Sequence, residues 1–513
     1  MKIDVYSHGF VVTKIVGPHQ ERAVVQFLKT LILYDQVPIE GSGGLTQTVA
    51  TKTFASSNAR REYYRFHINL LPDFLGMLDY NQISRREIEI ERHPLIIDDS
   101  YRVNFDVVKL WPPHEYQETL VSHITDEGSN KIVTLQPGGG KTLIAQHSML
   151  RLGVRTSAMM KGGYLDQWQA TLDKSFNFGR GQLVKVQGSV YLNAIMEMAL
   201  DKERLPDCML ISINTYSEYI RHFEANGVSS LYPIPPSEFF EKLKIGFNIF
   251  DEGHQFVHQV MKLFTYTNIH KFLTLSGTLD TRNAFNNRMY EIMYPRDKRM
   301  DGGYKNVYIS VSAVNWQLKD SRSLRYTGYK GAYSHTTFEQ NLLMGKNKKL
   351  LASYFDMVRS ITEYEFVSKM EKGQKMLLFA ATEKMCVAMM KDHQKHFPHL
   401  SIAVYTSKTK AKEKKRILEE CDIIVSTLGS AGTALDIPNL RVSWVTTAVD
   451  SQQANDQCLY RTRPMIGWPD IDPRFVYSVC TTIEKHVRYH RNKLEAFRGK
   501  VKEHGVIQSP FSV

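Results

Sequence analysis

The chain has 513 residues, of which 42% are apolar and 11% aromatic, and its formal net charge is +12 at pH 7. This length exceeds what one hydrophobic core serves, so we expect about three domains, and the composition excludes a disordered chain. The basic excess favours a polyanionic partner, either nucleic acid or an anionic membrane surface. No stretch is long enough to span a bilayer, and the first ten residues lack a signal-peptide core, so we expect no membrane association.

Residues 1–105 predict a small α+β domain. An amphipathic helix begins near Pro18, and residues 61–68 alternate like a half-buried strand with Tyr64 and Phe66 on one face. The other face and the segments after it carry basic and aromatic side chains: Arg61, Tyr63, Arg65, His67, Arg85, Arg86, Arg92 and His93. Such a face can hold a nucleic-acid backbone, and it can equally be a solvated strand face.

A glycine-rich loop follows a buried strand and precedes a helix. Gly138, Gly139 and Gly140 let backbone N–H groups point inward at a phosphate, because no β-carbon blocks the approach. Lys141 supplies a positive charge for the β- and γ-phosphates, and Thr142 supplies a hydroxyl for Mg²⁺. The helix after the loop directs its positive dipole end at the same anion. These features predict a P-loop.

A glutamine lies about fifteen residues upstream of the strand that leads into this loop. The amide of Gln117 can donate to and accept from one edge of adenine. Because a P-loop follows it, we interpret Gln117 as an adenine contact.

Two adjacent carboxylates end a later apolar strand. Asp251 can hold Mg²⁺ through water, and Glu252 can polarise the attacking water. His254 can hydrogen-bond across to the other half of the protein. A further strand ends at Ser276 and Thr278, whose hydroxyls can sense a γ-phosphate.

Ligand contacts in open α/β sheets collect at the carboxyl ends of the strands. Lys161 and Thr215 each follow a buried strand, so we expect a polymer to cross the sheet there. Residues 296–303 resemble a linker, and the second half repeats the strand–helix alternation without a P-loop. Two such lobes predict a nucleotide clamped between them.

The second half offers an acid and two arginines for that clamp. Asp436 lies in a loop of small residues, and Arg461 and Arg463 lie on or near the helix that carries Gln457. An arginine from a facing domain can stabilise the charge that develops on a transferring phosphate. Residues 484–502 form a basic amphipathic helix that either docks on the core or touches nucleic acid.

Taken in order, these motifs resemble the superfamily 2 helicases over about residues 108–490 and are most similar to the UvsW-type phage DNA helicases and related branch-migration enzymes. The resemblance implies an α/β fold with two RecA-like parallel-sheet lobes, ATP and Mg²⁺ as cofactors, and DNA as the partner. The implied domains are an N-terminal accessory domain (1–105), lobe one (106–303), lobe two (304–490) and a basic C-terminal tail (491–513).

The resemblance also implies a role for each matching residue. The implied catalytic residues are Glu252, Lys141, Arg461, Arg463 and Gln457, and the implied nucleotide contacts are Gln117, Gly138, Gly139, Gly140, Lys141, Thr142 and Asp436. The implied metal ligands are Thr142 and Asp251, the coupling residues are Ser276, Thr278 and His254, and the nucleic-acid contacts are Lys161, Thr215 and Thr427.

Four positions depart from the family pattern. Leu135 replaces the first glycine of the P-loop, and Gly253 stands where alanine is common, which we expect to be harmless. Ala434 replaces a frequent glycine. Tyr460 replaces the glycine before the arginines, which lie two residues apart instead of three, so either arginine is a candidate for the finger.

The sequence therefore predicts an ATP-dependent DNA helicase that unwinds or branch-migrates forked DNA in recombination, repair or replication. The five cysteines form no CxxC pair, so we expect reduced thiols and a cytoplasmic location, that of the bacterial host if the chain is phage-encoded. Three alternatives stay open: an RNA helicase, a nucleic-acid-binding scaffold with a silent motor, and a double-stranded translocase.

Overall fold

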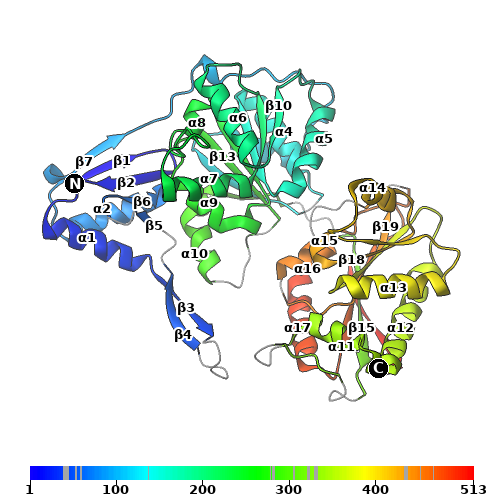
Figure 1. Ribbon diagram of the computed structural model, residues 1–513. Coiled ribbons are helices and arrows are strands. Elements are labelled where there is room, and N and C mark those ends of the chain that lie inside the picture. Colours follow the sequence, from blue (N-terminus) through cyan, green and yellow to red (C-terminus); the bar gives the residue numbers. More distant parts are fainter. Residues whose placement is uncertain are drawn as a thin grey trace. The chain divides into compact units, whose positions relative to one another are not determined.

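The computed structural model describes residues 1–512 except for 39–45, 52–54, 58–60, 137, 278, 280–283, 304–306, 320–323, 329–332, 432–436, 451 and 466. The chain divides into two compact units, Met1–Tyr304 and Lys305–Val513, and each is described by itself (Figure 1). In the described part of the chain, no helix combines the length and the apolar character needed to cross a membrane. All five cysteines are buried and free.

The first unit begins with a five-stranded sheet in the order β5-β6-β2-β1-β7, in which only the β1–β7 pair is parallel. Four phenylalanines (Phe10, Phe27, Phe66 and Phe74) form its core, with neighbouring ring centroids 5.1–5.7 Å apart. The elements are β1 (Lys2–Val5), β2 (Gly9–Thr13), α1 (Gly17–Thr30), β5 (Ala55–Ser57), β6 (Tyr64–His67), η1 (Ile68–Leu70), α2 (Leu71–Tyr80), η2 (Arg85–Glu87), β7 (Glu89–Arg92) and η3 (Asp99–Tyr101).

A separate antiparallel hairpin is formed by β3 (Leu33–Pro38) and β4 (Thr46–Thr51). Figure 1 shows this hairpin extending away from the five-stranded sheet.

Part of the predicted basic and aromatic face of the N-terminal sheet packs against the rest of the first unit, whereas Arg61, Arg85, Arg86 and Arg92 are exposed. His67 is fully buried, and its ring lies 5.2 Å from that of Phe264. Arg65 stacks over Tyr266, with 4.7 Å between Cζ and the ring centroid. His8 adds contacts to Phe264 and Phe272. This part of the face therefore joins two sheets of one unit, and neither the nucleic-acid interpretation nor the solvated-face interpretation fits His67 and Arg65.

The larger sheet of the first unit has seven parallel strands in the order β10-β11-β9-β12-β13-β8-β14. Its central strands are apolar and buried on both faces, because helices flank a parallel sheet on both sides (Figure 1). The elements are α3 (Glu115–Thr125), β8 (Asn130–Thr134), α4 (Lys141–Leu152), β9 (Thr156–Met160), η4 (Gly162–Tyr164), α5 (Leu165–Ser175), β10 (Leu183–Val186), α6 (Ser189–Leu200), β11 (Cys208–Ser212), α7 (Ile213–Asn226), α8 (Phe239–Lys242), β12 (Phe247–Asp251), η5 (Gly253–Phe256), α9 (Val257–Phe264), β13 (Lys271–Ser276), α10 (Ala284–Met293), η6 (Arg296–Lys298) and β14 (Arg299–Asp301).

The segment interpreted as a linker is structured. Residues 296–301 form η6 and β14, and β14 pairs with β8 as the edge strand of the sheet. The two units divide directly after residues 296–303, which were interpreted as the linker between the halves, but residues 296–301 are part of the first unit's fold. The sequence did not indicate this, because pairing of a polar edge strand leaves little trace in the pattern of apolar residues.

The second unit contains another seven-stranded parallel sheet, in the order β17-β18-β16-β19-β20-β15-β21. The elements are β15 (Ser310–Gln317), α11 (His335–Leu342), η8 (Gly345–Asn347), α12 (Lys348–Thr362), η9 (Glu363–Val367), β16 (Lys375–Ala380), α13 (Glu383–His396), β17 (Ile402–Tyr405), α14 (Ala411–Glu420), β18 (Ile423–Thr427), α15 (Leu428–Ala431), β19 (Leu440–Val445), α16 (Gln452–Leu459), β20 (Arg474–Cys480), α17 (Glu484–Phe497) and β21 (Glu503–Ser512).

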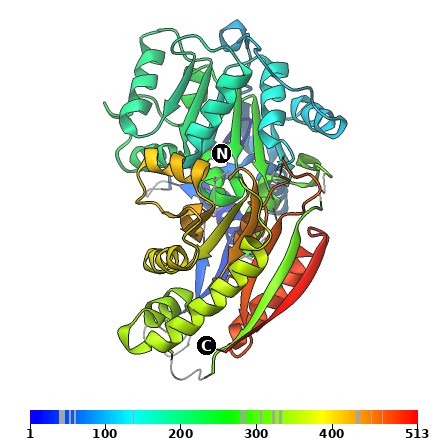
Figure 2. The same cartoon turned by 90° about the vertical axis from the view of Figure 1, so that its right-hand side faces the viewer.

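The residues assigned to a basic C-terminal tail belong to this sheet. Helix α17 continues to Phe497, which is buried, and β21 then pairs with β15 along most of its length. Figure 2 shows the red β21 beside the green β15. The prediction of a separate tail at residues 491–513 is therefore wrong for the described residues 491–512. The α17 contacts favour the core-docking alternative for the basic helix.

Three histidines are buried in the second unit. Burial lowers the pKa of His335 to about 3 and that of His393 to about 4, and it places the pKa of His486 well below its ordinary value. Each is neutral in the fold and takes up a proton on unfolding in weak acid. Their contribution to stability is fully present above the unfolded pKa of about 6.5 and is lost as the pH falls towards the folded pKa. Burial raises the pKa of the Glu339 carboxyl to about 7, so this group is protonated more readily in the fold than in the unfolded chain. Its contribution to stability therefore increases as the pH falls, opposite to that of the histidines.

We predict that His393→Gln makes the free energy of unfolding decrease less steeply as the pH falls. Below pH 6.5 the free energy of unfolding of the variant should fall by up to about 1.4 kcal/mol less per pH unit than that of the unchanged protein, because one proton fewer is taken up. Urea unfolding at several pH values measures this slope. His396→Gln is the control, since His396 lies on the same helix with an exposed side chain. Parallel curves for the unchanged protein and His393→Gln would contradict the prediction.

Candidate functional site

Three strand ends meet at one edge of the first unit's large sheet. Strand β13 lies between β8 and β12, and all three are parallel. The glycine loop after β8, the acidic pair at the end of β12 and Ser276 at the end of β13 therefore lie together. In the sequence the glycine loop lies more than a hundred residues before the acidic pair and Ser276.

The glycine loop takes a conformation that β-carbons would block. Gly138 and Gly140 have φ values of 88° and 85°, and Gly140 directly precedes the first turn of α4. A β-carbon on Gly139 would lie 2.6 Å from the side chain of Leu135, which is buried beneath the loop. Leu135 thus supports the loop from below at the position where the strict P-loop pattern has glycine.

Gln117 is clamped against this loop. Its Nε2 donates to the carbonyl of Gly139 at 3.1 Å, and its Oε1 accepts from the His114 N–H at 2.9 Å. The hydroxyl of Tyr116 donates to the same Gly139 carbonyl at 3.1 Å. A β-carbon on Gly140 would lie 2.3 Å from Nε2 of Gln117. The proposed adenine contact is therefore also a support of the phosphate loop, a role that the sequence did not indicate.

The acidic pair faces the loop. The Nζ atom of Lys141, at the start of α4, forms an ion pair with Oε1 of Glu252, and both side chains are largely buried. Glu252 has a φ of 52°, a left-handed conformation that is uncommon outside glycine and asparagine and that collects at functional sites. This pairing places the predicted phosphate-binding lysine and the predicted base side by side.

Asp251 lies beside this pair and is half-buried. Burial and the Glu252 carboxylate raise the pKa of Asp251 to about 6, while the Lys141 ammonium opposes that shift. The indole Nε1 of Trp168 donates to Asp251 Oδ2 at 2.8 Å. Trp168 is not among the site residues predicted from the sequence. Its position on the helix that follows the Lys161 turn was the available signal.

His254 links the acidic pair to β13. Its Nδ1 lies 2.8 Å from Ser276 Oγ and 3.3 Å from Glu252 Oε2. Burial lowers the pKa of His254 to about 4, so its imidazole is neutral at pH 7. His254 was predicted to hydrogen-bond to the other half of the protein, but the described contact is with Ser276 of its own unit. Thr278 lies outside the described residues.

The predicted nucleic-acid contacts lie at strand ends. Lys161 is an exposed residue after β9, and Thr427 is the last residue of β18, where its hydroxyl donates to Ser430 Oγ at 2.9 Å. Thr215 is buried, and its Oγ1 accepts from the Gly188 N–H at 2.8 Å, so it holds the start of α6. The exposed fraction of Thr215 is 8%, which makes it less accessible than expected for a backbone contact.

The remaining predicted residues belong to the second unit. Arg461 and Arg463 follow α16 and are partly exposed, with buried Thr462 between them. Gln457 lies within α16, although its side chain is outside the description, and Asp436 lies outside the described residues. Because the two units are described separately, the arginine-finger role stays a prediction.

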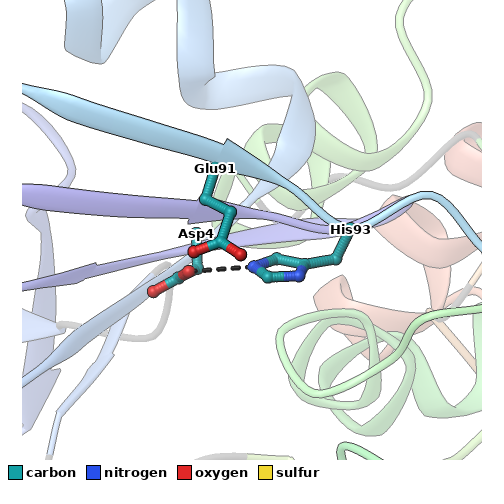
Figure 3. A group of neighbouring side chains, drawn as sticks. All are labelled: Asp4, Glu91 and His93. Carbon is teal, nitrogen blue, oxygen red and sulfur yellow. Dashed lines mark hydrogen bonds and ion pairs between the residues drawn. The ribbon is translucent and has the colours of Figure 1, made fainter.

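Among the residues that the structure describes, one group of His, Asp and Glu side chains is close enough to share a metal ion: Asp4, Glu91 and His93 (Figure 3). His93 Nε2 lies 2.9 Å from Asp4 Oδ1. The Lys2 ammonium already contacts both carboxylates, at 2.9 Å from Asp4 and 2.6 Å from Glu91. The cluster is therefore an internal ion-pair network with its own cation.

No family model and no curated protein match the chain. Solved structures do. S. cerevisiae Dbp5 bound to RNA and ADP BeF3 has a TM-score of 0.50 at 11% identity, over 78% of this chain and 90% of that one. Mss116p bound to ssRNA and AMP-PNP has a TM-score of 0.50 at 14% identity, over 77% of this chain and 74% of that one.

These likenesses establish the fold. The chain consists of two RecA-like lobes, each built on a seven-stranded parallel sheet, preceded by a small N-terminal α+β domain. This is the α/β fold with two parallel-sheet lobes and a small N-terminal α+β domain that the sequence predicts. At 11% and 14% identity the likenesses show the fold alone, so the resemblance to UvsW-type helicases stays a prediction.

Gly253 has a packing reason that the sequence did not reveal. A β-carbon there would lie 2.5 Å from Cγ2 of Thr274, whose hydroxyl is hydrogen-bonded to Tyr294. An alanine, which is common at this position in the helicases that the sequence resembles, does not fit here without a shift of Thr274.

We predict that Gly253→Ala lowers the free energy of unfolding by about 1–3 kcal/mol, the usual cost of overpacking. Thr274→Ser removes the obstructing methyl group and keeps the hydroxyl, so the double variant should regain most of the loss relative to Thr274→Ser alone. Denaturant unfolding of the three variants forms a double-mutant cycle. Additive effects would show that Thr274 is not what excludes the β-carbon.

Proposed function

We propose that the protein is an ATP-dependent nucleic-acid helicase. The observation that carries this proposal is the pairing of Lys141 with Glu252 at the edge where the P-loop and the strand ending in Asp251 meet. This ion pair places a phosphate-binding loop next to two carboxylates at the edge of the sheet. Phosphoryl transfer to water needs little more from a protein than positioning and charge stabilisation.

In the proposed mechanism the glycine loop and the first turn of α4 bind the phosphates. The amide groups of a first helical turn lack intrahelical partners and are directed at the anion together with the helix dipole. The residues present fit a magnesium ion, because hydroxyl and carboxylate oxygens are its preferred ligands, and Thr142 and Asp251 would hold it. When bound, the ion neutralises charge on the phosphate oxygens.

Glu252 is the proposed base that orients and deprotonates the attacking water. Its ion pair with Lys141 implies an exchange: a γ-phosphate attracts the ammonium and leaves the carboxylate to face water. His254 is neutral and contacts both Glu252 and Ser276, so it connects the base to the proposed coupling strand. Arg461 or Arg463 is the proposed arginine finger from the second lobe.

The nucleic-acid strand is proposed to cross the carboxyl ends of the strands at Lys161 and Thr427. The solved structures that share the fold hold RNA, which favours RNA as the substrate. DNA is the second candidate, because the motifs are most similar to those of the UvsW-type DNA helicases. In both cases phosphate contacts dominate, so affinity should fall steeply with salt.

We predict that Lys141→Ala reduces ATP hydrolysis by about 10²-fold or more, since a preorganised charge on the transferring phosphate is lost. The measurement is phosphate release with saturating oligonucleotide. Lys242→Ala is the control, because Lys242 is exposed on α8 with only a long contact to Glu238. An unchanged thermal unfolding midpoint shows that the variant is folded. Hydrolysis that survives in the folded variant would refute the site.

We predict that nucleic acid stimulates hydrolysis and that the preferred strand identifies the substrate. Single-stranded RNA, single-stranded DNA and forked DNA are compared for stimulation, together with displacement of a labelled strand from matched duplexes. Stimulation and unwinding by RNA alone support the RNA helicase, and a preference for forks supports branch migration. Tight ATP binding without stimulated turnover would instead support the silent scaffold and contradict the motor.

A further inference from the structure

Two neighbouring strand ends of the first lobe are joined by side chains. Strands β9 and β12 are parallel neighbours, with Phe250 opposite Met159. Helix α5 begins directly after the turn that follows β9, and its residue Trp168 donates to Asp251 at the end of β12. A second and longer contact runs from Gln255 Nε2 to the Tyr164 hydroxyl at 3.5 Å.

The indole is well suited to fix a carboxylate. Trp168 is 3% exposed, so its ring is held by its surroundings and its single N–H points in one direction. An indole donates one hydrogen bond and accepts none. The hydrogen bond to Asp251 Oδ2 is 2.8 Å long, which is short for a neutral donor and fits an ionised acceptor. A phenylalanine would fill much of the same space without this bond.

We propose that Trp168 is a positioning residue that orients Asp251 for the magnesium–nucleotide complex and couples it to the Lys161–Tyr164 turn. The inference rests on the proposed function, because it assigns the turn to nucleic acid and Asp251 to the metal. Trp168 belongs to the first helical turn of α5, which begins directly after the Lys161–Tyr164 segment. A bound nucleic-acid strand that displaces this segment would therefore also displace the indole. Coupling of this kind is reciprocal, so nucleotide and nucleic acid each alter the affinity for the other.

The test compares Trp168→Phe with the unchanged full-length protein. Binding of fluorescent methylanthraniloyl-ADP is measured while Mg²⁺ is varied. In Trp168→Phe the half-saturating Mg²⁺ concentration should rise about tenfold, the usual effect of losing a partner that orients a metal ligand. Binding in EDTA should be unchanged, because the phosphate loop is intact. Trp444→Phe is the matched control, since Trp444 is a buried tryptophan of the second unit whose Nε1 donates to Ser478.

Repeating the titration with a single-stranded oligonucleotide tests the coupling. The oligonucleotide should change the nucleotide affinity of the unchanged protein by a definite factor, and in Trp168→Phe that factor should approach one. Trp444→Phe should keep the full factor. A merely structural tryptophan would lower the unfolding midpoint without altering either the Mg²⁺ dependence or the factor, and that result would overturn the proposal.

A variant that fails to fold is replaced by a measurement on the native sequence. The protein is labelled with 5-fluorotryptophan, and the resonance of Trp168 is assigned by changing the other four tryptophans singly to phenylalanine. Mg²⁺ added to the nucleotide-bound protein should shift this resonance, and a static resonance would overturn the proposal. If the unchanged protein binds no nucleotide, the proposed function fails and the inference fails with it. If the unchanged protein binds nucleotide and Trp168→Phe shows the same Mg²⁺ dependence and the same oligonucleotide effect, only the inference fails.

Discussion

The contact between Lys141 and Glu252 depends on one constraint, the parallel order β12-β13-β8. The carboxyl ends of parallel strands lie at the same edge of the sheet. Residues that follow these strands therefore lie close together even when they are more than a hundred positions apart in the sequence. A strand inserted between β13 and β8, or reversed within the sheet, would separate the phosphate loop from the acidic pair. Each proposed chemical step in the first lobe relies on this convergence.

The site is held in place by groups that are not themselves reactive. Leu135 lies beneath the loop, Gln117 clamps it from the side, and Thr274 leaves room only for glycine behind the acidic pair. These contacts limit the freedom of the loop before any ligand binds, and such preorganisation is what electrostatic catalysis requires. The raised pKa of Asp251 and the left-handed backbone of Glu252 are features of the kind that collect at functional sites.

The N-terminal domain is integrated into the first unit more closely than its sequence indicates. His67 and Arg65 alternate with core residues along β6 and face the rings of Phe264 and Tyr266. Basic and aromatic residues on a strand serve a protein interface as readily as a nucleic-acid interface, since both supply stacking and cation–π contacts. The alternating pattern alone does not distinguish a protein interface from a nucleic-acid interface. The burial of the His67 ring shows that this part of the strand packs against protein.

The sequence by itself determined the local chemistry: the glycine loop, the acidic pair and the strand–helix alternation of both lobes. These signals are local, because glycine spacing and apolar periodicity act within a few residues. Only the tertiary structure decided that β14 and β21 complete their sheets, that Trp168 reaches Asp251, and that Thr274 excludes a β-carbon at Gly253. Edge pairing and side-chain contacts join residues distant in sequence, so packing of the whole lobe sets them and no short pattern records them.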